Sequence, residues 1–316
     1  CAIIEKIQKE VPIMSTNENK DKKAEVTALQ AISAEDRKDW ISLAFVQAGI
    51  CVCVPAFLLG ALLAEAMPIW PAIISGSLGY LIVVVGMVAT GMIGCDLGLA
   101  SCTCCQAGFG KSGARFIVST IFAVNMIGWF GIQNGVCGEA FSNAMLAMTG
   151  WDIPVVVSNT IWGIIMLLTA VYGVHALEKL DKISIPLLMI IMCYGTFLAF
   201  KVYGTGNLND EGTVQSMSFM SGVALSFNFT AVGTITGPDY TRFQKSRKDT
   251  VKSVFYGVFP MGVITLIMGI VLTKLSGQYD ISMVLIEVGL PLLGIIALVI
   301  STWTTNSTNA YSAGLN

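Results

Sequence analysis

Charged residues are scarce in this 316-residue sequence. They make up 12% of it, hydrophobic residues make up 54%, and the mean hydropathy is +0.73. Soluble domains carry roughly 25% charged residues. Fifteen of the 38 charged residues lie in residues 1–40, which leaves 23 for all the rest. This distribution excludes an ordinary soluble domain and predicts an all-α polytopic membrane protein, embedded in the lipid bilayer and preceded by a charged tail.

Residues that carry catalysis or bind metals are also few. Histidine occurs once, as His175, and there is no G-x-S-x-G, H-E-x-x-H or phosphate-loop motif. Four of the nine cysteines lie in apolar runs, and the C-T-C-C run at 102–105 has no partner pair at a finger-like spacing. No basic stripe for nucleic acid is present. We therefore expect neither an enzyme nor a bound cofactor, and the roles of the C-T-C-C run and of Glu139 stay open.

Eight apolar runs are long enough to cross a bilayer, which takes about 20 residues. The third and the eighth are long enough to tilt or to include a short surface helix. Residues 1–39 form a polar tail, predicted to be solvated and to hold a short surface helix near residues 31–38. The runs cover roughly residues 41–65, 69–92, 114–148, 154–174, 183–203, 215–237, 251–274 and 283–311.

Lysine and arginine are concentrated in alternate loops. The loop after the second run holds Lys111 and Arg115, the loop after the fourth holds Lys179 and Lys182, and the loop after the sixth holds five basic residues within 242–252. The other loops have two lysines, balanced by acidic residues. Because basic loops stay on the cytoplasmic side, we expect a protein of the cytoplasmic membrane with its N-terminus in the cytoplasm.

Helix breakers interrupt two of the apolar runs. The first run contains Gly49 and Pro55, and the sixth contains three glycines followed by Pro238. Backbone groups freed at membrane depth must line a cavity or find partners. Runs one and six are five apart, which is typical of an inverted repeat of five plus five helices with broken helices around a substrate at the midplane. The alternative is that glycine and proline are simply common in membrane helices.

Two polar patterns lie within apolar runs. In the third run, Trp129 and Gln133 are four residues apart and share one helix face. An indole beside an amide suits a flat heterocycle, although an interfacial tryptophan with a packing glutamine is the alternative. In the eighth run, hydroxyls occur at Ser301, Thr304 and Thr305, again on one face. Such oxygens suit a hard cation such as Na⁺; alternatively, they bond to carbonyls of their own helix.

Four segments together resemble the purine–cytosine permeases of the nucleobase:cation symporter group. They are G-W-F-G-I-Q (128–133), G-T-I-T-G-P-D-Y-T-R-F (233–243), I-G-C-D-L-G-L (93–99) with F-G-K-S-G (109–113), and W-T-T-N-S-T-N-A-Y (303–311). The resemblance implies a LeuT-like five-plus-five inverted repeat within a transmembrane domain at 40–316. The first repeat would occupy about 40–205 and an incomplete second repeat about 214–316.

The resemblance also implies a substrate site. Trp129 would stack on a nucleobase-like ring, with Phe229, or alternatively Phe227, as the second aromatic. Gln133 matches a substrate-binding glutamine of the hydantoin-transporting members. The cytosine permeases instead place a glutamine where Met126 stands, beside Asn125. The implied substrate-binding residues are Trp129, Gln133, Phe229, Asn228, Ser301, Asn125 and Asn309.

An ion site follows from the same resemblance. Backbone carbonyls of Gly49 and Val52 and the side chains of Ser301, Thr304 and Thr305 would bind Na⁺, with H⁺ as the alternative coupling ion. The function implied is cation-coupled import of a cytosine-, purine-, hydantoin- or allantoin-like compound by a monomer. A nucleobase-binding sensor without flux and an inactive truncated remnant are the rivals. Since the family has twelve membrane helices and about eight are present, we expect a fragment of a longer protein.

Overall fold

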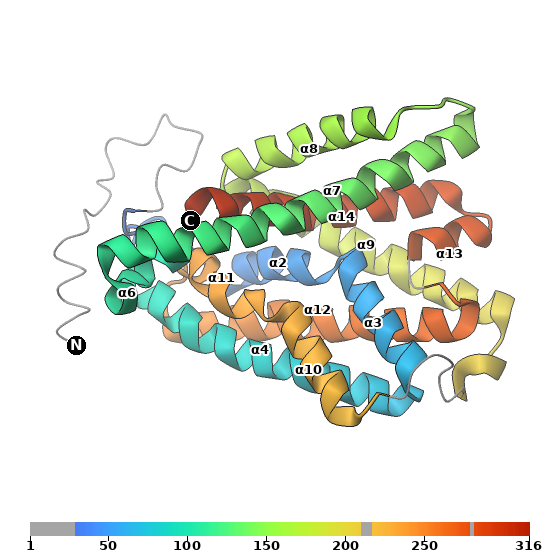
Figure 1. The fold of residues 1–316 in the computed structure, drawn as a ribbon, viewed down its shortest axis with the longest axis horizontal. Coiled ribbons are helices and arrows are strands. Elements are labelled where there is room, and N and C mark those ends of the chain that lie inside the picture. The colour runs from blue at the N-terminus through green and yellow to red at the C-terminus, as the bar shows by residue number, and fades with distance from the viewer. Residues whose placement is uncertain (1–28, 210–216, 279–280) are drawn as a thin grey trace.

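The computed structural model describes residues 29–209, 217–278 and 281–316, and the described part is almost entirely helical (Figure 1). Its elements are α2 (Trp40–Cys51), α3 (Val54–Ala66), α4 (Ile69–Leu97), α5 (Ser101–Cys104), α6 (Gln106–Gly113), a π-helical turn (Ala114–Val118), α7 (Ser119–Thr149), α8 (Val155–Val171), α9 (Val174–Tyr203), a 3-10 turn (Gly206–Asn209), α10 (Phe219–Thr230), α11 (Val232–Thr241), α12 (Arg247–Ser276), α13 (Ile281–Glu287) and α14 (Pro291–Leu315).

Each predicted apolar run corresponds to one helix or a helix pair. Within the described residues, five helical segments are long and apolar enough to cross a membrane, and the bent pair α2 and α3 makes a sixth. The 17-residue α8 is shorter, and α14 is rich in hydroxyls and amides in its second half. The extra length of run three is taken up by the π-helical turn and the 31-residue α7, and that of run eight by the short α13 that precedes α14.

The first run breaks where the sequence places its proline. Helix α2 ends at Cys51, Val52 has non-helical dihedrals (φ −89°, ψ 74°), and Cys53 is extended before Pro55 enters the first turn of α3. Proline is favoured there because it has no N–H to satisfy. The two halves are bent by 54°. The sixth run is interrupted more mildly, at Ala231 between α10 and α11.

The predicted breakers of the sixth run are not the residues at which it is interrupted. Gly237 and Pro238 both lie inside the helix α11. Gly237 instead allows close packing on α4, since a Cβ at this position would lie 2.9 Å from Thr90 Oγ1 and 3.0 Å from the carbonyl of Met87. The glycine in this run therefore serves the approach of two helices, and only the first run has the sharp break.

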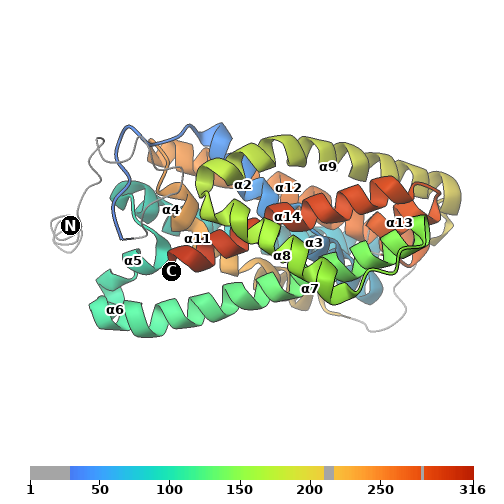
Figure 2. The same cartoon turned by 90° about the horizontal axis from the view of Figure 1, so that it is seen from above.

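The broken first helix lies in the middle of the bundle (Figures 1 and 2). Helix α4 packs against α10, α11 and α12, and α12 also contacts α2, α3 and α9. On the other side, α14 packs against α7, α8 and α9, and contacts α2. The main core cluster joins apolar side chains of α2, α3, α4 and α12. This arrangement places the free backbone ends of the break where several helices meet.

The segment before α2 differs from the prediction of a solvated tail with a short helix near 31–38. Residues 1–28 lie outside the described residues, but 29–39 are irregular and packed against helix ends. Ile32 is only 7% exposed. The Arg37 side chain donates to the carbonyls of Cys95 and Gln244, both at 2.8 Å, and Lys38 forms an ion pair with Glu178. Backbone bonds from Ile32 to the Gly98 carbonyl and from Lys38 to the Phe243 carbonyl stand in place of the bonds that a local helix would make.

A second correction concerns the predicted loop at 175–182. This stretch forms the first turns of α9, which begins at Val174. Lys179 and Lys182 are therefore on a helix rather than in a loop. The only histidine, His175, is exposed there, as expected for a surface residue, and its Nδ1 lies 3.0 Å from Lys38 Nζ.

Candidate functional site

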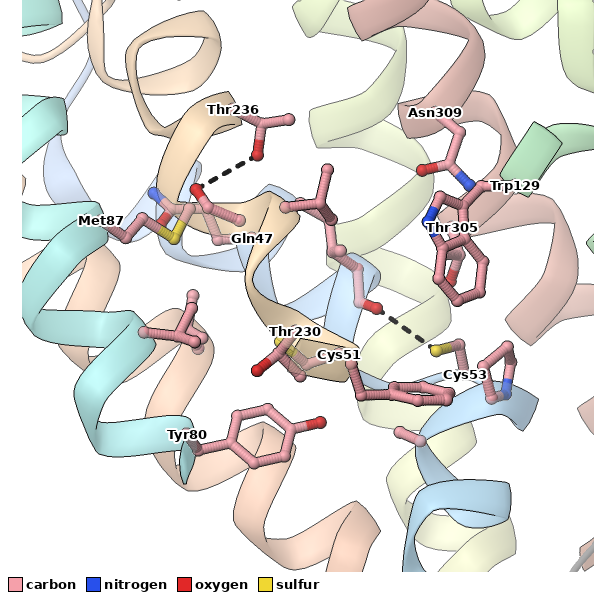
Figure 3. Close-up of a pocket in the computed structure, with 18 of the residues that line it drawn as sticks. Gln47, Cys51, Cys53, Tyr80, Met87, Trp129, Thr230, Thr236, Thr305 and Asn309 are labelled. Atoms are coloured by element: carbon pink, nitrogen blue, oxygen red, sulfur yellow. Dashed lines mark hydrogen bonds between the residues drawn. The ribbon is translucent and has the colours of Figure 1, made fainter. Parts of the chain in front are cut away.

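A pocket opens beside the break of the first helix, with about 820 Å³ of space unoccupied by atoms. Side chains from α2, α3, α4, α7, α10, α11, α12 and α14 line it. In Figure 3, Tyr80 and Met87 of α4 face Trp129 and Asn309 across the pocket. The lining residues are Gln47, Ile50, Cys51, Cys53, Pro55, Ala56, Tyr80, Val83, Met87, Met126, Trp129, Gln133, Phe229, Thr230, Val232, Gly233, Thr236, Tyr240, Val258, Thr305 and Asn309.

The lining is uncharged. Among the described residues that surround the pocket there is no Asp, Glu, Lys, Arg or His, and the polar groups are amides, hydroxyls and thiols. A few polar groups on an apolar wall orient a small ligand, while the apolar surface contributes affinity. A net charge on the ligand would have to be desolvated without a counter-charge on the wall, which is unfavourable. The pocket is therefore suited to a neutral, partly apolar molecule.

Two aromatic side chains meet in the pocket. The ring centroids of Trp129 and Phe229 are 5.8 Å apart, and the planes are inclined by 70°, an edge-to-face contact. A flat ring sandwiched between two parallel aromatics needs about 7 Å between them, because each stacked layer takes roughly 3.5 Å. The two rings now touch each other, so a sandwich would require them to turn parallel and to separate by about an ångström.

Gln133 lies one turn from Trp129 on α7. It is 3% exposed, and its Oε1 has no hydrogen-bond partner among the described residues. A buried acceptor without a partner is unfavourable by about 1–3 kcal/mol. A ligand that donates a hydrogen bond here would remove that penalty. Asn309 of α14 also lines the pocket, so the structure brings together Trp129, Gln133, Phe229 and Asn309.

Three other predicted substrate residues lie apart from the lining. Asn125 and Asn228 are exposed. Ser301 is buried, and its hydroxyl donates to the carbonyl of Leu298 at 3.0 Å within α14. Neighbouring positions point into the pocket instead: Met126 beside Asn125, and Phe229 beside Asn228. Adjacent residues on a helix point about 100° apart, and in these two pairs the apolar residue takes the inward direction.

The predicted ion residues converge where α14 crosses the end of α2. The Thr305 hydroxyl lies 2.8 Å from the carbonyl of Gly49 and 3.0 Å from the carbonyl of Ser301. The Thr304 hydroxyl also lies 3.0 Å from the Ser301 carbonyl. Val52 stands at the break. Thr304 and Thr305 thus bond to a carbonyl of their own helix, and Thr305 also reaches the facing carbonyl of Gly49, while the role of these oxygens in ion binding stays a prediction.

The sequence interpretation missed Gln47. This amide is 0% exposed, its Nε2 lies 3.3 Å from Ser253 Oγ, and its Oε1 has no partner in the described part of the chain. It lines the pocket from α2, two residues before Gly49. An amide directly before a predicted helix break was the signal that could have found it, because the break places its neighbours at a cavity.

The C-T-C-C run has poor chemistry for a metal site. Burial raises the pKa of the Cys104 thiol to about 12, and burial also raises the pKa of Cys105. Among the residues that the structure describes, no three His, Cys, Asp or Glu side chains lie where they could hold a metal ion together. The Cys104 thiol instead lies 3.5 Å from the carbonyl of Leu99. The run thus forms the packed turn of α5 between α4 and α6.

Fold and pocket together define a class: a polytopic helical membrane protein with a LeuT-like arrangement around a broken first helix. The family model described as "Permease for cytosine/purines, uracil, thiamine, allantoin" matches residues 32–316. The chain belongs to this permease family, and it is not an enzyme.

Curated relatives are similar over most of the chain. Cytosine permease of Escherichia coli (strain K12) is 29% identical over 283 residues, which cover 88% of this chain and 65% of that protein. Purine-uracil permease NCS1 of Arabidopsis thaliana is 25% identical, and the match covers 84% of this chain and 49% of that protein. Allantoin permease of Bacillus subtilis (strain 168) is 23% identical, and the match covers 71% of this chain and 50% of that protein. The chain thus spans between half and two thirds of the length of these relatives.

Solved structures share the fold. Mhp1, a nucleobase-cation-symport-1 family transporter, in a closed conformation with bromovinylhydantoin bound, has a TM-score of 0.82 at 18% identity. The match covers 90% of this chain and 66% of that chain. The inward-facing conformation of Mhp1 has a TM-score of 0.73 at 19% identity.

Proposed function

We propose that this protein imports a nucleobase or a related flat heterocycle of the cytosine, purine, hydantoin or allantoin class, coupled to a cation. The observation that carries the proposal is the uncharged pocket beside the broken first helix, in which an indole, a phenyl ring and three amides converge. The relatives' names are those of permeases for such compounds. Nucleobases and hydantoins are flat, largely neutral and rich in amide-like groups, which fits this lining.

Trp129 would stack on the heterocycle, and Gln133 would exchange hydrogen bonds with its amide edge. Because Trp129 and Phe229 touch edge to face, binding would be accompanied by a reorientation of the Phe229 ring at the junction of α10 and α11. Movement of one helix group against the other would then carry the substrate across. Asn309 would add a polar contact from α14.

The coupling ion in this proposal is Na⁺, with H⁺ as the alternative. The Thr305 hydroxyl lies within hydrogen-bond distance of the carbonyl oxygens of both Gly49 and Ser301, and hard cations take oxygen ligands. In the membrane, the end of the bundle that carries residues 29–39 and the basic residues of the α11–α12 junction would face the cytoplasm. The protein would reside in the cytoplasmic membrane as a monomer.

Uptake by proteoliposomes tests this function. Radiolabelled cytosine, uracil, hypoxanthine, allantoin and hydantoin are offered with an inward Na⁺ gradient, with a proton gradient, or with neither. We expect gradient-driven accumulation of at least one compound. Binding without counterflow would identify a sensor instead, and a complete lack of binding and uptake would contradict the proposal.

Trp129→Ala tests the stacking role. A base stacked on an aromatic side chain contributes about 1–3 kcal/mol, so the affinity for the accumulated compound should fall about 5- to 150-fold. Trp151→Ala is the matched control, because Trp151 is 69% exposed in the segment between α7 and α8 and does not line the pocket. Equal affinity in both variants would remove Trp129 from the site.

A further inference from the structure

A carboxylate reaches the end of α2 from α9. Asp181 is 0% exposed, and its side chain lies directly against Gly49. A Cβ on Gly49 would lie 2.7 Å from Asp181 Oδ1, 2.9 Å from Cγ and 3.2 Å from Oδ2. Glycine is therefore the residue that gives the carboxylate room. Neither carboxylate oxygen has a hydrogen-bond partner among the residues that the structure describes.

Burying a carboxylate without hydrogen-bond partners or a counter-charge destabilises the fold. A buried charge needs a paired cation or several hydrogen bonds, and without them the penalty is several kcal/mol. The neighbouring lysine does not supply the pair. Lys182 Nζ lies 2.7 Å from Glu178 Oε1 and 3.2 Å from Ser42 Oγ. Asp181 thus has the position of a charged ligand whose partner is not a side chain of the described residues.

The surroundings of Gly49 are rich in oxygen and poor in donors. The Thr305 hydroxyl is within 3.0 Å of two carbonyls, those of Gly49 and Ser301, yet it has one proton and can donate to only one of them at a time. The two carboxylate oxygens of Asp181 add to this set. A proton would satisfy a single oxygen, whereas a hard monovalent cation uses several oxygens at once.

We propose that Asp181 is an anionic ligand of the coupling Na⁺, so that the ion site is built from three helices: the carbonyl end of α2, the hydroxyl face of α14 and the carboxylate of α9. The inference rests on the cation coupling of the proposed function and adds the residue that supplies the charge. Bound Na⁺ neutralises Asp181 and holds α9 against the broken helix. Loss of Na⁺ leaves a buried charge there, which favours separation of α9 from α2.

The test measures thermal unfolding of the purified protein in detergent, in NaCl and in choline chloride of equal ionic strength, without any nucleobase. We expect Na⁺ to raise the apparent melting temperature of the unsubstituted protein. Asp181→Asn keeps the shape and removes the charge, so the Na⁺-induced shift should disappear. Glu178→Gln, one turn away on the same helix but ion-paired, is the matched control and should keep the full shift.

Direct binding of ²²Na⁺ provides the second measurement. We expect Asp181→Asn to weaken Na⁺ binding at least tenfold and Asp181→Glu to restore part of it, because glutamate keeps the charge but is one methylene longer. If Asp181→Asn does not fold, Asp181→Ser, which also removes the charge, takes its place. The inference is overturned if the unsubstituted protein binds no Na⁺, or if the variant without the charge binds it as tightly as Glu178→Gln.

These readouts separate the two proposals. A Na⁺-dependent shift that requires Asp181, in a protein that accumulates none of the five heterocycles, would overturn the proposed substrate class and support the ion ligand. Heterocycle uptake driven by a proton gradient, with no Na⁺ binding, would overturn the ion ligand and support the substrate class.

Discussion

Two buried aspartates differ in what surrounds them. Asp239 of α11 and Asp181 of α9 are both 0% exposed. The Asp239 carboxylate accepts from the Ser101 backbone N–H at 2.8 Å and from Asn316 Nδ2 at 3.0 Å, and the positive charge of the buried Arg242 acts on it. The Asp181 carboxylate has no such partner in the described part of the chain.

The difference separates a structural carboxylate from a ligand. Asp239 joins α11 to α5 and to the end of α14, so its hydrogen bonds hold three elements together at one end of the bundle. Asp181 stands against the backbone of α2 with both oxygens unused. A buried polar group without a partner calls for a physical explanation, such as an ion. Burial alone therefore does not identify a functional acid, whereas burial without partners indicates one.

Asp239→Ala should give the largest loss of stability. Removing the carboxylate leaves the Ser101 amide without its acceptor, takes one of two acceptors from Asn316 Nδ2 and removes the negative charge near Arg242, and breaking such a buried set costs about 3–5 kcal/mol. Unfolding in mixed micelles with SDS measures this change. Asp239→Asn, which keeps one acceptor oxygen, should lose less. If Asp239→Ala were as stable as the unsubstituted protein, the structural role of this cluster would be wrong.

Gly49→Ala should have the next largest effect. The added methyl group would lie 2.7 Å from Asp181 Oδ1, so the carboxylate or the helix must shift, and overpacking of this kind costs about 1–3 kcal/mol. In an Asp181→Ala background the same substitution should cost little, because the obstructing atoms are gone. The double-mutant cycle measures this coupling, and strictly additive effects would contradict the contact between α2 and α9.

Much of this site follows from residue spacing. The Gly49 to Pro55 stretch predicts a break near the middle of the first run, and α2 ends within it. Trp129 and Gln133 share a helix face whatever their neighbours, and both line the pocket. The hydroxyls at 304 and 305 fall on the α14 face that meets α2. The spacing of residues along a helix determines which of its side chains lie on one face, so these features can be predicted without knowing how the helices pack.

Asp181 could not be found because the start of its helix was misplaced. Four charged residues at 178–182 are typical of a solvated loop, and the fifth run was predicted to begin at 183. With α9 beginning at Val174, Asp181 falls in line with Leu177, Ser184, Ile185 and Leu188, which are all buried. That row has helical spacing. Which helix covers this face depends on tertiary packing. Tertiary packing also decides which residue faces the pocket in each of the pairs Asn125–Met126 and Asn228–Phe229.

Asp181→Asn should change stability little in the absence of Na⁺, and in the opposite direction from Asp239→Ala. Asn has nearly the same size but carries no charge, so the substitution removes an unpaired buried charge rather than a set of hydrogen bonds. Replacing buried ionic groups with well-packed residues is neutral or stabilising by about 1–4 kcal/mol, and the amide of Asn, itself a buried polar group without a partner, should keep the gain at the low end. Unfolding in choline chloride measures it. A loss as large as that of Asp239→Ala would mean that Asp181 has protein partners after all.

Glu178→Gln should have the smallest effect. Glu178 forms ion pairs with Lys38 and with Lys182, and the Lys182 side chain is 43% exposed. The pair with Lys182 contributes about 0–1 kcal/mol because solvent screens it. In the pair with Lys38 both side chains are only 13% exposed, but glutamine keeps an acceptor oxygen for the lysine. The variant should therefore unfold nearly like the unsubstituted protein in NaCl and in choline chloride alike. If Glu178→Gln instead removed the response to Na⁺, the net charge of α9 would matter rather than one unpartnered carboxylate, and the contrast between Asp181 and Asp239 would lose its meaning.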